Sequence, residues 1–144
     1  MTRHGLSPRV LTGDFEEESG TAAAEELLGD AERADALFAA NDMMAIGALV
    51  AFQRAGLGVP ADIAVAGFDD IPLARFVTPA LTTMRVGIAE IGAEAVSRAA
   101  AILSGGKDTE IRWVAPQIKP RGSTLGGTAE LPSDRRIPGH DSRI

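Results

Sequence analysis

Short strand-like apolar segments alternate with longer helix-like segments along the first 120 residues. This alternation constrains the fold more than any other feature of the sequence. Short strand-like runs end in polar residues and are followed by longer stretches of helix-forming residues. We expect strands at 10–12, 36–40, 63–66, 81–84, 111–114 and 117–118, helices at 16–28, 43–55 and 88–103, and a helical turn at 71–76. Such alternation predicts an α/β fold with a Rossmann-like, mostly parallel sheet flanked by helices.

Composition narrows the function classes. The chain has 144 residues, enough for one domain with a hydrophobic core, and a formal net charge of -6, which argues against a nucleic-acid surface. It contains no cysteine, and its two histidines lie near opposite ends, so we expect neither a disulfide nor a metal site, and no cofactor. No apolar run approaches the roughly 20 residues of a membrane helix. The first residues lack the apolar core of a signal peptide, so we expect a cytoplasmic protein without membrane contact.

Three successive strands are expected to end in short polar tips. These tips are Gly13-Asp14-Phe15, Ala40-Asn41-Asp42 and Phe68-Asp69-Asp70. In an open parallel sheet, ligands bind outside the carboxyl ends of the strands. Carboxylates accept hydrogen bonds, an amide both donates and accepts, and an aromatic ring offers an apolar face. The tips therefore suit a hydroxylated small molecule such as a sugar or a nucleoside.

Each of these residues also has a structural interpretation. Asp42 is favoured as the cap of the next helix, and Asn41 is open between a cap and a ligand contact. Asp14 can bind its own backbone in a turn, and Asp70 is favoured as a cap or a solvated turn residue. Phe68 is favoured as core. The pattern alone leaves both interpretations open.

At these residues the sequence resembles the LacI/GalR family of bacterial transcription regulators. The resemblance rests on ESG at 18–20, LFAANDMMAIGA at 37–48, GLGVPADI at 56–63, VAGFDDIPLA at 65–74, PALTT at 79–83 and RGST at 121–124. It covers about residues 6–124, and the order and spacing of the blocks make it specific. The resemblance implies a type I periplasmic-binding-protein-like fold of two lobes with an effector between them, of which this chain is the incomplete, C-terminal half.

The resemblance also implies a domain division. Residues 1–124 would form a partial effector-binding and dimerisation domain. Within it, about 6–83 would belong to the C-terminal lobe, 84–115 to the other lobe, and 116–124 to the return of the chain. The remaining residues, 125–144, are rich in Gly, Pro, Ser and charge, which predicts a disordered tail.

Residue roles follow from the same resemblance. Phe15 matches the family's aromatic residue beside the effector, and Asn41 and Asp69 match its hydrogen-bonding residues; Asp14 and Asp70 are weaker candidates. The family's dimer contacts correspond here to Ile46, Leu73, Phe76 and Val77. We therefore expect a homodimer that binds a small-molecule effector and contacts DNA only through a headpiece absent from this chain. The helix at 88–103 is expected to expose an apolar stripe and to promote self-association.

Two other functions share some of these features. A sugar-binding receptor of an ABC importer shares the fold, but the motif blocks favour the regulator. An enzyme would need Asp14, Asp69 and Asp70 as acid–base groups or Mg²⁺ ligands, yet no activated nucleophile or phosphate-binding loop accompanies them. We expect no enzymatic activity. A fragment that folds only with its missing half is a further alternative, compatible with the regulator.

Overall fold

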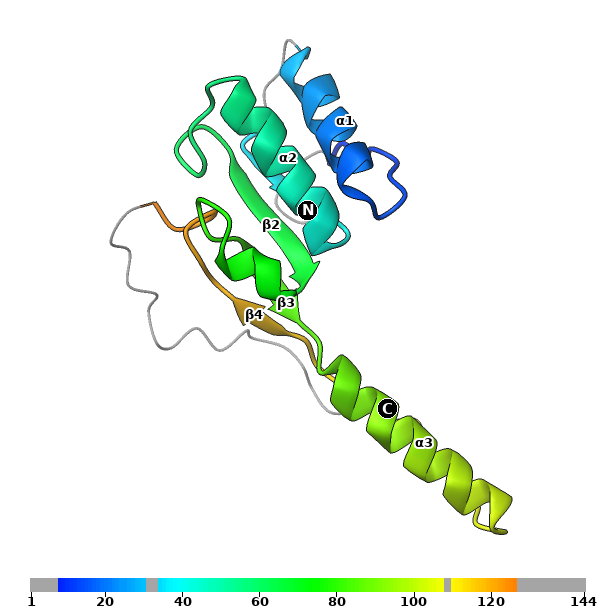
Figure 1. The fold of residues 1–144 in the computed structure, drawn as a ribbon. Helices are drawn as coiled ribbons and strands as arrows, with labels where there is room; N and C mark the ends of the chain where they lie inside the picture. Colours follow the sequence, from blue (N-terminus) through cyan, green and yellow to red (C-terminus); the bar gives the residue numbers. More distant parts are fainter. Residues whose placement is uncertain (1–7, 31–33, 108–109, 127–144) are drawn as a thin grey trace.

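A computed structural model describes residues 8–30, 34–107 and 110–126 (Figure 1). Its elements, in chain order, are α1 (Glu17–Leu28), β1 (Ala36–Phe38), α2 (Asp42–Arg54), β2 (Ala64–Asp69), the 3-10 helix η2 (Pro72–Arg75), β3 (Thr82–Arg85), α3 (Ile88–Leu103) and β4 (Gln117–Lys119). The expected helix at 88–103 and the helical turn beginning at Pro72 are both confirmed.

The strands form one open sheet in the order β1-β2-β3-β4. The pairs β1–β2 and β2–β3 are parallel, and β4 is antiparallel to β3. The prediction of a mostly parallel α/β sheet is therefore confirmed. Because β1, β2 and β3 run in the same direction, their carboxyl ends lie along one edge of the sheet.

The core lies between α2 and one face of the sheet. Alternation along β2 places Val65 and Gly67 on that face, where both are buried. A Cβ added to Gly67 would lie 3.2 Å from the Cβ of Ala45, so α2 approaches the strand closely. The fully buried Phe52 and Leu81 add the largest side chains to this core.

Helices α1 and α2 pack side by side with their backbones in contact (Figure 1). A Cβ added to Gly20 in α1 would lie 2.0 Å from the carbonyl oxygen of Met44, and one added to Gly47 in α2 would lie 2.0 Å from that of Glu17. The hydroxyl of Thr21 donates to the Gly47 carbonyl oxygen at 3.2 Å. Glycine at both positions is thus a steric requirement of this helix pair.

We predict that Gly47→Ala lowers the free energy of unfolding by about 1–3 kcal/mol, because the added methyl group meets backbone that cannot rotate away. Urea denaturation measures the change. Gly92→Ala is the matched control, since a Cβ at Gly92 in α3 has no atom within 4 Å. Alanine is the better helix former, so the control should leave stability unchanged or raise it by up to about 1 kcal/mol. Equal losses in both variants would contradict the packing argument.

The returning chain is tied into the sheet at Ser123, which is completely buried. Its hydroxyl donates to the Val65 carbonyl oxygen at 2.6 Å and accepts from the Thr82 amide at 2.8 Å. Its backbone accepts from the Val65 amide at 2.9 Å and donates to the Ala80 carbonyl oxygen at 3.0 Å. Ser123 therefore bridges the beginnings of β2 and β3.

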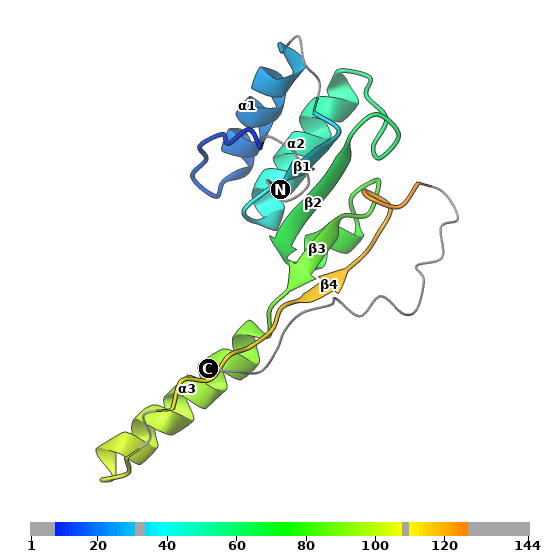
Figure 2. The ribbon, with the colours of Figure 1, turned by 180° about the vertical axis from the view of Figure 1, so that it is seen from behind.

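Helix α3 extends away from the sheet beyond β3 and β4, and Figure 2 shows the same arrangement from behind. None of its residues is buried. The chain beyond it is held by charged groups, with Arg112 2.8 Å from Glu94 and the Arg98 guanidinium donating to the Glu110 carbonyl oxygen at 2.5 Å. The expected apolar stripe is confirmed as exposed and includes Ile88, Ile91 and Ile102. Among the described helices, none is long and apolar enough to cross a membrane.

Two expected strands are wrong. Residues 10–12 and 111–114 are apolar but form no strand, because no neighbouring strand in the described ranges pairs with them. Val10 and Trp113 are largely exposed as a result.

Of the predicted disordered tail, only 125 and 126 are described, and the Leu125 amide donates to the Arg121 carbonyl oxygen at 3.2 Å. Residues 127–144 lie outside the described part of the chain.

Candidate functional site

Polar side chains gather at the carboxyl edge of the sheet. Asn41 follows β1, and Asp69 is the last residue of β2. The two strands are parallel neighbours, so both residues come to the same edge. Phe15 reaches this edge from the loop before α1, and its carbonyl oxygen accepts a hydrogen bond from the Asn41 amide nitrogen at 2.7 Å.

Asn41 is the N-cap of α2. Its side-chain oxygen accepts from the Met44 amide at 2.9 Å, while its side-chain nitrogen holds the loop at Phe15. An amide group has a second lone pair and a second N–H, so both functions leave hydrogen-bonding capacity for a ligand. The loop it holds presents the Phe15 side chain, which is 61% exposed. One side chain therefore orients both the helix and the aromatic residue.

We predict that Asn41→Ala lowers the free energy of unfolding by about 1 kcal/mol, since the Met44 amide loses its cap. Asn41→Asp separates the two roles, because a carboxylate still caps α2 but cannot donate to the Phe15 carbonyl oxygen. It should retain most of the stability while the fluorescence or chemical shift of a probe at residue 15 changes. Urea denaturation and NMR measure the two effects. Equal destabilisation by both substitutions would show that capping is not the main role.

Asp42 is not the helix cap, so that expectation is wrong. It is the first residue of α2, and its carboxylate is fully buried. The Thr83 hydroxyl donates to Oδ1 at 2.5 Å, and the Ile71 amide donates to Oδ2 at 2.9 Å. A side chain at Gly67 would displace this carboxylate, since its Cβ would lie 2.4 Å from Oδ1. Asp42 joins α2 to the ends of β2 and β3.

Asp69 and Asp14 differ in environment. Burial, and then the nearby charge of Asp42, raise the pKa of the half-buried Asp69 carboxyl above its ordinary value. Asp69 has a φ of 116°, in a region that favours glycine.

Asp14 is exposed, and hydrogen bonds from Ser19 and then the Glu16 amide lower its pKa. The Glu16 amide donates to Asp14 Oδ1 at 3.1 Å, which confirms the turn interpretation of Asp14.

Asp70 is buried, so the expectation of a cap or a solvated turn residue is wrong. Its side chain is 1% exposed and contacts Arg121, Arg85 Nε at 2.6 Å, and Arg75 at 3.8 Å. Burial would raise the pKa of the Asp70 carboxyl, but hydrogen bonds and charge from Arg121 and Arg85 outweigh it and lower the pKa. The carboxylate is occupied by these groups and faces no open site.

Sequence reasoning missed the partners of these buried acids. The sequence analysis assigned no role to Arg85, and it included Arg121 only as part of a family motif. One signal was available, because Thr82 and Thr83 are polar residues within a strand, and a buried hydroxyl needs a partner. The acids themselves lay in the predicted tips, but the sequence does not reveal which of two adjacent aspartates turns inward.

The expected dimer residues divide into two groups. Leu73 and Phe76, in and after η2, are 45% and 80% exposed. Ile46 and Val77 are partly buried against the core. Leu73 and Phe76 are therefore accessible to a partner, whereas Ile46 and Val77 contribute mainly to the packing of the core.

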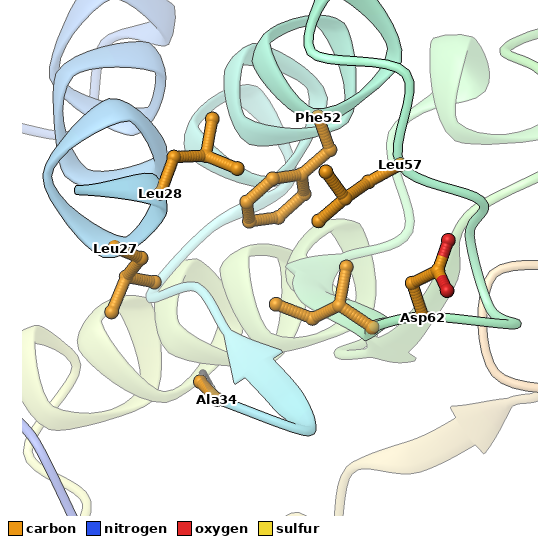
Figure 3. Close-up of a pocket in the computed structure, with 7 residues that line it drawn as sticks. Leu27, Leu28, Ala34, Phe52, Leu57 and Asp62 are labelled. Atoms are coloured by element: carbon orange, nitrogen blue, oxygen red, sulfur yellow. The ribbon is translucent and has the colours of Figure 1, made fainter. Parts of the chain in front are cut away.

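A small apolar cavity lies at the opposite end of the sheet (Figure 3). It is lined by Leu27, Leu28, Ala34, Phe52, Leu57, Asp62 and Ile63. These residues come from the ends of α1 and α2 and from positions before β1 and β2, away from Asn41 and Asp69. Its volume of about 20 Å³ has room for about one water, which excludes it as the site of a sugar-sized ligand. Within residues 8–30, 34–107 and 110–126, no group of His, Cys, Asp and Glu has the arrangement of a metal site.

Comparison with known proteins agrees with this fold. The family described as periplasmic binding protein-like domain matches residues 1–124. The lactose operon repressor of Rhizobium radiobacter is 46% identical over 114 residues, which are 74% of this chain and 100% of that protein. The HTH-type transcriptional repressor PurR of Pectobacterium atrosepticum is 40% identical over 119 residues, which are 82% of this chain and 35% of that repressor.

Solved structures agree as well. A LacI family transcriptional regulator from an Arthrobacter species, in complex with lactose, is 32% identical with a TM-score of 0.77; the match covers 86% of this chain and 47% of that one. The fold thus defines a periplasmic-binding-protein-like domain. More narrowly, the chain belongs to the LacI family and covers the C-terminal effector-binding part of such regulators. It spans about a third of the PurR sequence.

Proposed function

We propose that this chain is the effector-sensing part of a LacI-type transcription regulator and that its effector is a hydroxylated small molecule, sugar-like or nucleoside-like. The observation that carries the proposal is the placement of Phe15, Asn41 and Asp69 at one edge of the sheet, with Asn41 bonded directly to the Phe15 loop. The related regulator in complex with lactose supports a sugar. The repressor names of the relatives favour a regulator over an importer receptor.

The three residues have complementary chemistry. Phe15 offers an exposed apolar ring against which the C–H face of a sugar packs. Asn41 retains one donor and one acceptor. Asp69 accepts hydrogen bonds from hydroxyl groups, and a hydrogen bond to an ionised carboxylate is about twice as strong as a neutral one. Because burial and Asp42 disfavour the Asp69 carboxylate in the free chain, a hydroxyl that binds it relieves an existing cost.

Asp69→Asn tests the effector site through stability and binding together. The raised pKa means that ionisation of Asp69 destabilises the folded chain at neutral pH. The substitution should therefore raise the melting temperature at pH 7. The gain should shrink as the pH falls through the raised folded-state pKa and vanish below about pH 4, where the unfolded carboxyl is also protonated. The same variant should lose most of the thermal shift that a panel of sugars, beginning with lactose, gives the wild type.

Asp62→Asn is the matched control. The Asp62 carboxylate is exposed and accepts only the Gly58 amide, at 2.7 Å, at the far end of the sheet. It should keep the sugar-induced shift. A wild-type shift that survives in Asp69→Asn would contradict the assignment of Asp69.

We further propose that the chain forms a homodimer through Leu73 and Phe76, supported by Ile46 and Val77. Phe76 is 80% exposed and Leu73 45%, so both apolar side chains are available to be buried against a second copy of the chain. Phe76→Asp should weaken self-association by about 2 kcal/mol, or about thirtyfold in Kd, as measured by gel filtration with light scattering. Phe38→Asp is the control, because Phe38 is similarly exposed but lies on the edge strand β1. Equal weakening by both would reject this interface.

The remaining parts of the regulator follow from this assignment. We propose that the described residues up to 83 belong to one lobe, that the segment 84–115 belongs to the other, and that 116–124 form the return of the chain. Operator DNA would be contacted by a separate headpiece, consistent with the net charge of -6 on this chain. Such a regulator acts in the cytoplasm.

A further inference from the structure

The Asp70 carboxylate contacts three arginines that belong to three different segments. Arg85 is the last residue of β3, where the chain leaves for α3, and its Nε and terminal nitrogen lie 2.6 and 2.5 Å from Oδ2. Arg121 lies just after β4, on the returning chain, and donates to Oδ1. Arg75 ends η2, 3.8 Å away. One carboxylate thus holds the two segments that connect the sheet to α3, the one that follows β3 and the one that returns through β4, and it lies near the arginine that ends η2.

Arg121 is held in two directions. Besides Asp70, its guanidinium donates to the Leu81 carbonyl oxygen at 2.8 Å, and its backbone amide donates to the Thr82 hydroxyl at 2.7 Å. Arg121 is the most buried of the three, with 16% of its side chain exposed, whereas Arg85 is 43% exposed. The pair Asp70–Arg121 therefore forms the inner part of the cluster, and Arg85 closes it on the solvent side.

The cluster is joined to the candidate effector site through hydrogen bonds. The Asp70 amide donates to the Thr83 hydroxyl at 3.2 Å, and Thr83 donates to Asp42. Asp42 follows Asn41, which holds Phe15, and Asp70 follows Asp69. Asp69 is thus the direct neighbour of Asp70, and Asn41 is linked to Asp70 through Asp42 and Thr83. A polar network of this kind couples sites when its members have more than one arrangement.

We propose that Asp70 is a positioning residue that sets the direction of two crossing segments, 85–91 after β3 and 117–124 on the returning chain, relative to Asp69. Asp70 thereby couples contact between Asp69 and the effector to the orientation of these two segments. The coupling rests on the proposed effector site, whereas the positioning is a property of the ligand-free chain. Asp70 itself does not contact the effector, because its side chain is 1% exposed and its oxygens are taken by arginines.

Hydrogen exchange of the full chain tests the positioning without ligand. In Asp70→Asn, the backbone amides of 85–91 and 117–124 should exchange about tenfold faster, while those of α1 and α2 stay within about twofold of the wild type. Asp62→Asn, a matched substitution away from the cluster, should change neither region. If Asp70→Asn fails to fold, Arg85→Gln replaces it, because it leaves Asp70 paired with Arg121. Unchanged exchange in 85–91 and 117–124 would overturn the proposal, as would a uniform increase across the chain.

Lactose serves as the probe for the coupling. Bound lactose should slow exchange near Asn41 and Asp69 and also in 85–91 and 117–124. In Asp70→Asn it should still slow exchange near Asn41 and Asp69 but no longer in the two crossing segments; retained slowing there would overturn the coupling. A purely structural role would lower protection in both states by the same factor. If neither sugars nor nucleosides alter exchange in the wild type, the proposed function fails, while the ligand-free comparison still decides whether Asp70 positions the segments.

Discussion

The insertion of Ser123 between β2 and β3 is the interaction on which the rest of the structure depends. A parallel pair of strands leaves its first amides and carbonyls unpaired where the strands diverge, and unpaired buried backbone groups are costly. Ser123 satisfies four of them, through its hydroxyl and its own backbone. This contact brings a segment from the far end of the described chain next to β2. It thereby places Arg121 where it can reach Asp70.

The three aspartates at the carboxyl edge of the sheet differ in how well the surrounding structure stabilises their charge. Asp42 and Asp70 are buried but fully partnered, by Thr83 and the Ile71 amide in one case and by arginines in the other. Asp69 lies between them in sequence and has no comparable partner among the residues that the structure describes. Its carboxyl is disfavoured in the ionised form, and its backbone is in a region that favours glycine. Residues that cost stability without a packing reason are typical of binding sites. The contrast between Asp69 and Asp70 therefore supports the proposed effector role of Asp69.

Much of the fold could be predicted from the sequence because its signals are local. Both ends of the helix at 88–103 were predicted correctly, because its apolar periodicity and the two glycines that follow it can be recognised without knowledge of tertiary contacts. The cap of α2 was misassigned because Asn41 and Asp42 have the same local propensity, and only the contact with Thr83 distinguishes them. The apolar runs at 10–12 and 111–114 satisfy a strand pattern, yet a strand exists only beside a partner. The Asp70 cluster was missed because its two close partners, Arg85 and Arg121, lie 15 and 51 residues away in the sequence.

The attachment of α3 has a mechanical consequence. A helix of 16 residues is about 24 Å long, and α3 has no buried residue to brace it along that length. It joins the sheet through a short link after Arg85, whose guanidinium is fixed to Asp70. The Arg85–Asp70 ion pair therefore lies at the point where α3 is attached to the sheet. Over that length, a change of about 10° in the direction of the helix at this attachment would displace Leu103 by roughly 4 Å.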